Sequence, residues 1–493
     1  MKCSVKATSD PLRTRSALLL LTVASPPGAL EGTLGAADAL VGGAIGLAVK
    51  DGEVTGKRGE ASLFHVPGGT GPRRIAVVGV GKDGARDDWQ AAGQAFAKLA
   101  AKARATSVTV AFPADVSEDH AQALVEGVWI GDYRFDRFKG GDGDGNENGA
   151  GGSRIRDLTV VGRGLTAARL SRTATVMEHA AASRDLANTP SNHLDPEMLA
   201  AYATKLAASV PGLTCRVLGV RDLEKLGAGA LLAVGRGSAV PPRMIVLRWK
   251  PPKARRGETL GLVGKAVTFD TGGISIKPSA SMEDMKMDMT GGAIAIEGIA
   301  AIARLGLPIA TMAVIPCAEN MPSGTAIKPG DVVTAMNGKT IEVINTDAEG
   351  RLILADGLTY AARNGATRIV EFSTLTGAMV VALGSVYAGL FGSDGDWTET
   401  VRAAAEATGD LAWPMPLHEG YRPLIRSAVA DLSNAAKKRE AGAVYAAMFL
   451  REFTEGVPWC HLDIAGAAMG SGASTGYGLR LIAELADRVA SGS

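Results

Sequence analysis

The stretch VGKAVTFDTGG, residues 263–273, is expected to join a buried strand to a turn that carries a charged side chain. Its apolar residues predict a strand that ends at Asp270. Gly272 and Gly273 follow at once, and glycines let a backbone approach a ligand closely. In open α/β sheets, side chains at the carboxyl ends of strands face the ligand crevice. Asp270 and Lys265 are therefore candidate site residues.

Two further stretches carry ionisable side chains next to glycines. They are SIKPSASMEDMKMD, residues 275–288, and NTDAEGRL, residues 345–352. Their candidate site residues are Lys277, Asp288, Asp347, Glu349 and Arg351. We expect Asp347 and Glu349 to follow the strand EVIN on extended chain, where residues two apart share a face and could bind one pair of cations.

Carboxylates gathered in a crevice are costly to bury unless cations neutralise them. The three stretches together supply four such groups, with lysines and an arginine beside them. Oxygen ligands of this kind suit Zn²⁺, Mn²⁺ or Mg²⁺. The sequence therefore predicts a site for two adjacent divalent cations.

Size and patterning predict a large α/β protein. The 493 residues are 46% hydrophobic, enough for more than one core. Apolar and helical stretches alternate along the chain, which predicts a mixed, mostly parallel sheet covered by helices. We expect an N-terminal α/β domain at 1–175 and a C-terminal α/β domain, including a linker helix, at 176–493. The Gly-rich stretch 140–153 is expected to be a flexible surface insertion.

Charge and cysteine content argue against several classes of partner. The formal net charge of +1 gives no long-range field for nucleic acid or an anionic membrane. No apolar run reaches the ~20 residues of a membrane span, and ALLLLTVAS near the N-terminus is expected to be a buried strand, not a signal peptide. The four cysteines are scattered, so a disulfide framework is not expected. These features favour a cytoplasmic protein.

Other motifs are weaker. GVGKDG, residues 79–84, matches GxGxxG but lacks the acidic residue ~20 positions on that dinucleotide binding requires. DGDGN within the Gly-rich stretch fails the calcium-loop pattern at its sixth and twelfth positions. The six histidines include no HExxH pair, and no GxSxG occurs. Any metal site here is therefore expected to use oxygen ligands.

NTDAEGRL, with the other two stretches at their observed spacing, resembles the leucyl aminopeptidases of the peptidase M17 (cytosol aminopeptidase) family. The resemblance runs from about residue 185 to the end, and the N-terminal third resembles the family's macro-like domain more weakly. Supporting stretches are SRDLANTPSN (183–192), PSGTAIKPGDVVTAMNGKT (322–340), STLTGAM (373–379) and HLDIAG (461–466).

The resemblance implies two divalent metal ions per subunit, Mn²⁺ or Zn²⁺. One ion would be held by Lys265, Asp270, Asp288 and Glu349, and the other by Asp270, Asp347 and Glu349. Two such ions lower the pKa of a shared water, so that hydroxide becomes available as the nucleophile. Lys265 can be a ligand only when deprotonated, and we expect adjacent cations and burial to lower its pKa.

The resemblance also implies roles for groups that are not ligands. Lys277 would stabilise the oxyanion of the tetrahedral intermediate. Arg351 would hold a bicarbonate ion, aided by the backbone amides of Gly350 and Leu352 at a helix N-terminus. The substrate would be contacted by Met285, Asn345, Ala348, Thr374, Leu375, Gly377 and Ala467.

The expected activity is removal of the N-terminal residue from peptides, with a preference for Leu-like or Met-like first residues. The family forms homohexamers, so a homohexamer is expected. Some members also bind DNA as architectural proteins, a second role that the N-terminal domain would carry. The neutral charge balance disfavours that role.

Overall fold

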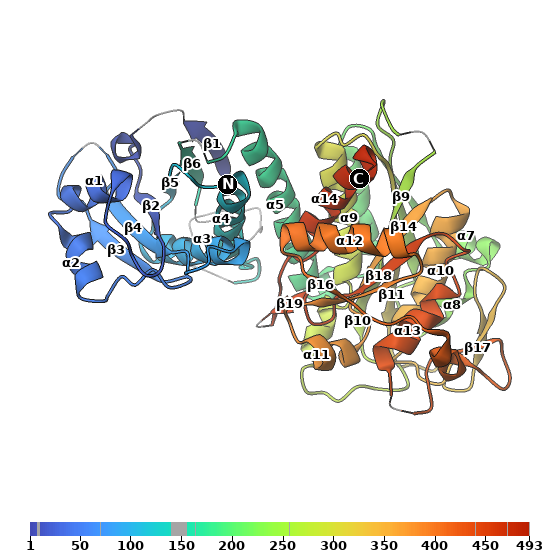
Figure 1. The fold of residues 1–493 in the computed structure, drawn as a ribbon. Coiled ribbons are helices and arrows are strands. Elements are labelled where there is room, and N and C mark those ends of the chain that lie inside the picture. Colours follow the sequence, from blue (N-terminus) through green and yellow to red (C-terminus); the bar gives the residue numbers. More distant parts are fainter. Residues whose placement is uncertain are drawn as a thin grey trace. The chain divides into compact units, whose positions relative to one another are not determined.

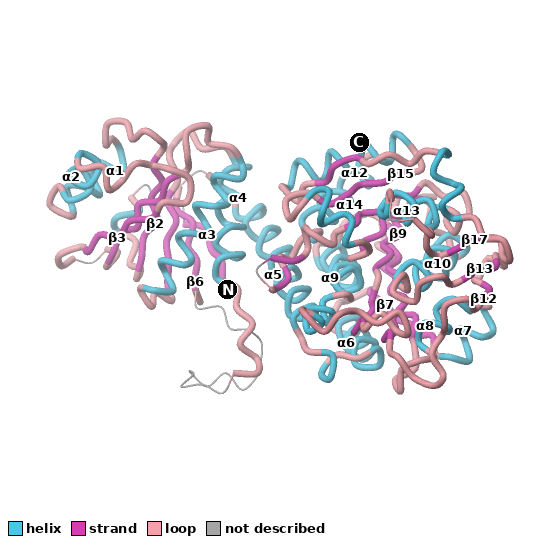
Figure 2. Tube along the Cα trace, turned by 90° about the horizontal axis from the view of Figure 1, so that it is seen from below, coloured by secondary structure: helices cyan, strands magenta, loops and turns pink. Residues whose placement is uncertain are grey.

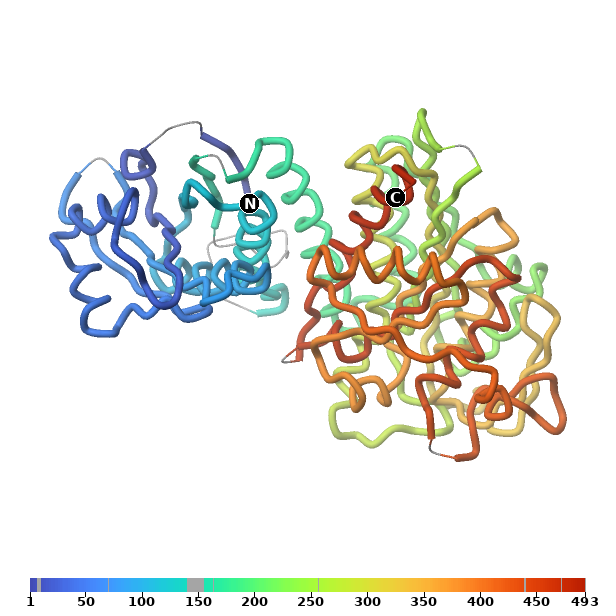
Figure 3. The backbone as a smooth tube through the Cα atoms, in the orientation of Figure 1, coloured from blue at the N-terminus to red at the C-terminus, as the bar shows by residue number. Residues whose placement is uncertain are grey.

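The computed structural model describes residues 1–6, 10–69, 71–139, 155–162, 164–255, 257–438, 440–470 and 472–492. The chain divides into two compact units, Met1–Glu178 and His179–Ser493. Each unit is one continuous segment of chain, blue to teal and then green to red in Figure 3. The insertion expected at 140–153 lies outside the described residues.

The N-terminal unit is a sheet with helices on both faces (Figure 1). Its described strands pair in the order β1-β6-β5-β2-β4-β3, and all pairs are parallel except β3 with β4. The apolar run near the N-terminus forms the buried strand β2. The elements are β1 (Lys2–Lys6), η1 (Pro11–Arg13), β2 (Leu18–Val23), α1 (Gly32–Leu40), α2 (Ala44–Lys50), β3 (Ala61–His65), β4 (Arg74–Gly79), α3 (Arg86–Lys102), β5 (Ser107–Ala111), α4 (Glu118–Asp132) and β6 (Asp157–Val161).

No single helix in the described parts of the chain is long and apolar enough to cross a membrane. Helices α1 and α2 meet the length and hydropathy requirement only when taken together, and a bend of 109° separates them.

The C-terminal unit is built on a larger mixed sheet. Its order is β16-β15-β18-β14-β9-β11-β8-β7, with β10 pairing β11. The central pairs of β14 with β18, β14 with β9 and β9 with β11 are all parallel. The strands of this sheet are β7 (Leu213–Leu218), β8 (Arg243–Trp249), β9 (Thr259–Gly264), β10 (Ala266–Asp270), β11 (Ala310–Asn320), β14 (Arg368–Ser373), β15 (Ala388–Gly392), β16 (Ala412–Pro414) and β18 (Trp459–Asp463).

Helices cover both faces of this sheet, and its strands lie between them in Figure 2. Helix α9 packs on β9, β11 and β14 from one side, with α14 against it. Helices α8, α10 and α13 share an apolar core with the opposite face. The helices are α5 (Ala167–Asn188), which enters from the first unit, η2 (Ser191–His193), α6 (Pro196–Ala208), α7 (Val220–Leu226), α8 (Gly229–Gly235), η3 (Met282–Met287), α9 (Thr290–Arg304), α10 (Gly350–Arg363), α11 (Gly377–Leu383), α12 (Gly395–Thr408), η4 (Glu419–Ile425), α13 (Gly442–Arg451) and α14 (Leu479–Ser491).

Two small sheets complete the unit. They are formed by β12 (Val332–Thr334), β13 (Thr340–Glu342) and β17 (Leu432–Ser433), and by β19 (Met469–Gly470) with β20 (Ala473–Ser474). The two-unit α/β architecture with mixed, mostly parallel sheets agrees with the expected fold class. The predicted strand GETLGLVGKAVTF, residues 257–269, is broken, however, because β9 ends at Gly264 and β10 starts at Ala266. Lys265 occupies the break.

The N-terminus of α9 lies unusually close to the sheet. A Cβ atom at Gly291 would lie 2.0 Å from the carbonyl oxygen of Phe372, which belongs to β14. Only glycine permits this approach. It brings the end of η3, and Asp288 directly after it, close to β14.

We predict that Gly291→Ala lowers the free energy of unfolding by about 2–3 kcal/mol, because backbone must shift to accept the methyl group. The midpoint of urea unfolding, followed by tryptophan fluorescence, measures the effect. Gly395→Ala is the matched control, since no atom lies within 4 Å of a Cβ at the first residue of α12. Equal midpoints for the two variants would contradict the prediction.

Candidate metal centre and active site

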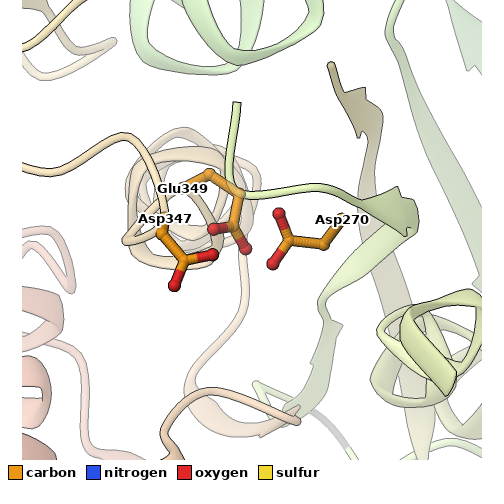
Figure 4. Close-up of side chains that lie close together, drawn as sticks. All are labelled: Asp270, Asp347 and Glu349. Atoms are coloured by element: carbon orange, nitrogen blue, oxygen red, sulfur yellow. The ribbon is translucent and has the colours of Figure 1, made fainter. Parts of the chain in front are cut away.

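Three buried or partly buried carboxylates converge at the carboxyl edge of the large sheet. Asp270 ends β10, while Asp347 and Glu349 lie in the loop that leads into α10. One oxygen from each lies within 4.8 Å of the others. Figure 4 shows the carboxylates of Asp270 and Glu349 facing each other, with Asp347 beside them. The residues chosen from separate stretches of sequence therefore meet.

Two lysines lie among these carboxylates. Lys265 Nζ lies 2.7 Å from Asp288 Oδ2 and 3.0 Å from Glu349 Oε1. Lys277 Nζ lies 2.8 Å from Asp270 Oδ2 and also pairs with Asp347. Asp288 thus joins the cluster through Lys265, and six of the seven predicted site residues form one connected group. Four carboxylates face two ammonium groups, so an excess of negative charge remains.

The electrostatics of the group reflect burial and crowding. Burial and the neighbouring Glu349 raise the pKa of Asp270 to about 6. Burial, only partly offset by Lys265, raises the pKa of Asp288 to about 8. Burial also opposes ionisation of Glu349, but Lys265 and Lys277 outweigh it and lower its pKa. Ionised carboxylates here therefore need added positive charge.

Lys265 experiences opposing influences. Burial by itself lowers its pKa, but Asp288, Glu349 and Asp270 outweigh burial and raise it. The protein groups alone do not provide the lowering expected for a lysine ligand. That lowering requires the repulsion of an adjacent cation.

The donor set fits divalent cations. The oxygens come from carboxylates on separate elements, as hard cations prefer. Glu349 Oε2 is fully buried and has no hydrogen-bond partner among the described residues. A buried, unpartnered carboxylate oxygen of this kind suits a cation ligand, because the alternative is an uncompensated desolvation cost.

The loop before α10 differs from the expected extended chain. Strand β13 ends at Glu342, and Glu349 has helical angles, φ −76° and ψ −34°. The expectation that Asp347 and Glu349 share one face of an extended segment was therefore wrong. They converge because the chain turns there, and Ala348 N–H donates to the Asn345 carbonyl at 3.2 Å.

Asn434, which follows β17, holds this turn. Its Oδ1 accepts from the N–H groups of Ile344 at 2.8 Å and Asn345 at 3.3 Å. Its Nδ2 donates to the carbonyl oxygens of Asn345 at 2.7 Å and Ala348 at 3.3 Å. Sequence reasoning missed this residue because nothing in its local pattern indicates contacts 86 to 90 positions away.

Asn320 has a similar function for the first carboxylate. Its Nδ2 donates to Asp270 Oδ1 at 2.8 Å and to the Thr346 carbonyl at 3.0 Å, which links β10 to the loop. Asn320 ends β11. A polar residue at the end of an apolar run was the available signal.

Gly350 allows Lys265 to reach the site. A Cβ atom at Gly350 would lie 2.5 Å from Lys265 Cε. The next residue, Arg351, is buried and donates from Nη1 to the Asn434 carbonyl at 2.6 Å. Its guanidinium lies 5.1 Å from the ring centre of Tyr445. Leu352 N–H already donates to the Glu349 carbonyl at 2.9 Å.

Two of the predicted substrate-contacting residues, Thr374 and Asn345, contact members of the cluster. Thr374 Oγ1 donates to Asp288 Oδ1 at 2.7 Å, and its carbonyl accepts from Lys265 Nζ at 3.2 Å. Asn345 Oδ1 accepts from Asp347 N–H at 2.9 Å. The remaining residues follow strand ends or flank the loops, namely Met285 in η3, Ala348 before α10, Leu375 and Gly377 after β14, and Ala467 after β18.

Fold and site together define a class, that of α/β enzymes with a cluster of carboxylates suited to divalent metal ions. The Cytosol aminopeptidase family, catalytic domain, matches residues 181–483, and the Cytosol aminopeptidase family, N-terminal domain, matches residues 24–141. The chain belongs to the cytosol aminopeptidase family and is a metallo-aminopeptidase.

Relatives agree over most of the chain. A probable cytosol aminopeptidase of Solibacter usitatus is 46% identical over 85% of this chain and 86% of its own length. A probable cytosol aminopeptidase of Azoarcus sp. is 39% identical over 98% of this chain and 98% of its own length. A mutant of tomato leucine aminopeptidase, 32% identical, matches with a TM-score of 0.89 over 99% of this chain and 96% of its own. The manganese complex of the bottromycin maturation enzyme BotP is also 32% identical. It matches with a TM-score of 0.83 over 96% of this chain and 100% of its own.

We predict that Asn434→Asp weakens Mn²⁺ binding about tenfold or more, a scale typical of groups that orient metal ligands. The change removes both N–H donors to the loop and adds a negative charge beside it. Isothermal titration of the chelator-treated protein with Mn²⁺ measures the effect. Asn364→Asp, at the exposed end of α10, is the control and should leave the affinity unchanged; equal loss in both variants would refute the prediction.

Proposed function

We propose that this protein is a leucyl aminopeptidase that uses two divalent metal ions, Mn²⁺ or Zn²⁺. The observation that carries the proposal is the convergence of the carboxylates of Asp270, Asp347 and Glu349, joined to Asp288 through Lys265. One ion would be held by Lys265, Asp270, Asp288 and Glu349, and the other by Asp270, Asp347 and Glu349. Bound there, the ions would supply a hydroxide nucleophile near neutral pH and polarise the scissile carbonyl.

The chain's own cations would perform the rest of the reaction. Lys277 retains its charge, since the surrounding carboxylates outweigh burial and raise its pKa, and it is positioned to stabilise the oxyanion. Arg351, fixed by the Asn434 carbonyl and stacked on Tyr445, would hold a bicarbonate ion. Gly350 would help through its backbone amide at the start of α10, and the Leu352 amide would contribute by exchanging its contact with the Glu349 carbonyl for the anion. The bicarbonate would carry the proton of the attacking water to the leaving amine.

The side chain of the first substrate residue would contact Met285, Thr374, Leu375, Gly377 and Ala467. These residues are apolar or small, which favours Leu-like or Met-like side chains. Asn345 and Ala348 would contact the substrate from the loop before α10. We place the activity in the cytoplasm, in keeping with the relatives named cytosol aminopeptidases.

The proposed assembly is a homohexamer. Its support in this chain is an apolar exposed segment on and after α11, where Val381 is 89% exposed and Val386 is 61% exposed. Exposed apolar side chains gathered in one segment are typical of interfaces.

We predict that Asp288→Ala loses one metal ion and nearly all activity, whereas Lys277→Ala keeps its metal and loses about 100-fold or more in kcat, the cost of one oxyanion contact. Release of the chromophore from a leucine anilide, before and after chelation and with Mn²⁺ or Zn²⁺ restored, measures activity, and elemental analysis measures metal. Lys328→Ala, on the surface, is the control. Full turnover by Lys277→Ala would remove that residue from the mechanism.

For the assembly, we predict that sedimentation equilibrium gives the mass of six chains, and that Val381→Asp lowers it. Burying a charge in an apolar interface is unfavourable, so the variant should dissociate. A parent protein that sediments as a single chain would contradict the proposed hexamer.

A further inference from the structure

Among the ion pairs of the C-terminal unit outside the candidate site, one joins two strands of the large sheet. His461 Nδ1 and Glu371 Oε2 lie 2.5 Å apart, and both residues are fully buried. They occupy directly paired positions on the parallel strands β14 and β18. The imidazole stacks against two rings, with centroid distances of 5.6 Å to Phe391 and 6.0 Å to Trp459. Its orientation is therefore fixed by packing.

The apolar surroundings make the desolvation of this ion pair unfavourable. Phe391, Trp459 and Ile369, the neighbours on the same sheet face, belong to the apolar core shared with α10 and α13. Replacing a buried ion pair by apolar residues of similar volume is often neutral or stabilising. Stability alone therefore gives no reason for an ion pair at this position, and a role in the reaction is the alternative.

Several polar atoms on this face have no partner among the described residues. They include Glu371 Oε1, His461 Nε2 and Ser373 Oγ, together with Arg351 Nε at the start of α10. Buried atoms of this kind usually bond to ordered water. Glu371 and His461 therefore satisfy only one polar atom each through their mutual contact, which adds to the cost of placing the pair here.

The strand ends connect the pair to the site. Two residues beyond His461, Asp463 accepts from Thr376 Oγ1 at 2.6 Å and from Leu375 N–H at 3.3 Å. This fixes the loop in which Thr374 contacts Asp288 and Lys265. The Glu371–His461 contact ties β14 to β18 directly below that loop.

The pair is also coupled to Arg351 by charge. Burial by itself lowers the pKa of His461, but Glu371 and Asp463 outweigh burial and raise it, while Arg351 acts in the opposite direction. These are the charged groups that face the imidazole from β14, β18 and α10. His461 therefore stays protonated to higher pH than an ordinary histidine and loses its proton as the pH rises through the raised value, which leaves a net negative charge near Arg351.

We propose that Glu371 and His461 are positioning residues for peptide hydrolysis. Their contact holds the loop after β14, and their combined charge determines how strongly Arg351 attracts an anion. The proposal rests on the proposed function of Arg351 as the residue that holds an anion. With His461 protonated the pair is neutral and Arg351 is free to hold the anion. With His461 neutral, the Glu371 carboxylate is left uncompensated, and its negative charge opposes binding of the anion.

The test is the pH profile of kcat for leucine anilide hydrolysis by the manganese-loaded protein. The parent should lose kcat as the pH rises through the pKa of His461. His461→Gln should lack this ionisation and have a kcat lowered about tenfold, with metal content and KM unchanged. Glu371→Gln and the double variant should lose no more than His461→Gln, since the two residues act as a unit.

The chain offers a matched control in His179, whose Nδ1 lies 2.6 Å from Glu297 Oε2 in an equally buried pair of the same unit. His179→Gln should reduce stability comparably and keep the parent's profile. Superimposable profiles for the parent and His461→Gln, or an equal change in His179→Gln, would overturn the inference.

A second measurement needs no turnover. With six histidines in the chain, selective ¹⁵N labelling gives few imidazole signals, and His461→Gln identifies one of them. Added bicarbonate should neutralise the charge of Arg351 and raise the pKa of His461 further. An unaltered His461 titration overturns this inference even if the protein hydrolyses peptides. Failure of the parent to hydrolyse leucine anilide would instead overturn the proposed function.

Discussion

The concentration of buried negative charge at one sheet edge governs the rest of the C-terminal unit. Asp270, Asp288 and Glu349 are almost fully buried, where ionised carboxylates are stable only beside positive charge. Lys265 and Lys277 supply part of it and separate groups that would otherwise repel. A structure of this kind is poised for cations, and the membership of a metal-dependent peptidase family agrees with that physical demand.

Neutral side chains and backbone hold the charges in position. Asn320 and Asn434 reach the site from segments distant in sequence and bond mainly to backbone, so they fix geometry without adding charge. The missing side chain at Gly350 gives Lys265 its space. The arrangement of these carboxylates and lysines therefore depends on amide contacts and close packing as well as on the ionic contacts.

The sequence predicted which residues gather at the site better than it predicted their geometry. Strand ends and flanking glycines identified Asp270, and six of the seven ionisable residues form one group of contacts. The turn that brings Asp347 beside Glu349 was missed, because it depends on Asn434, and such long-range contacts leave no local pattern. The strand break at Lys265 was also missed. The segment from Val263 to Phe269 is apolar enough to suggest one continuous strand.

The division of the chain into two uninterrupted segments has a consequence for synthesis. Domains generally fold as units as they leave the ribosome, the N-terminal one first. Residues Met1–Glu178 need no later segment to complete their sheet, whereas β18 and α14 of the second unit come from the last part of the chain. The nascent chain therefore completes the sheet of its first unit before β18 is made, and the large sheet stays open between β14 and β15 until that strand has left the ribosome.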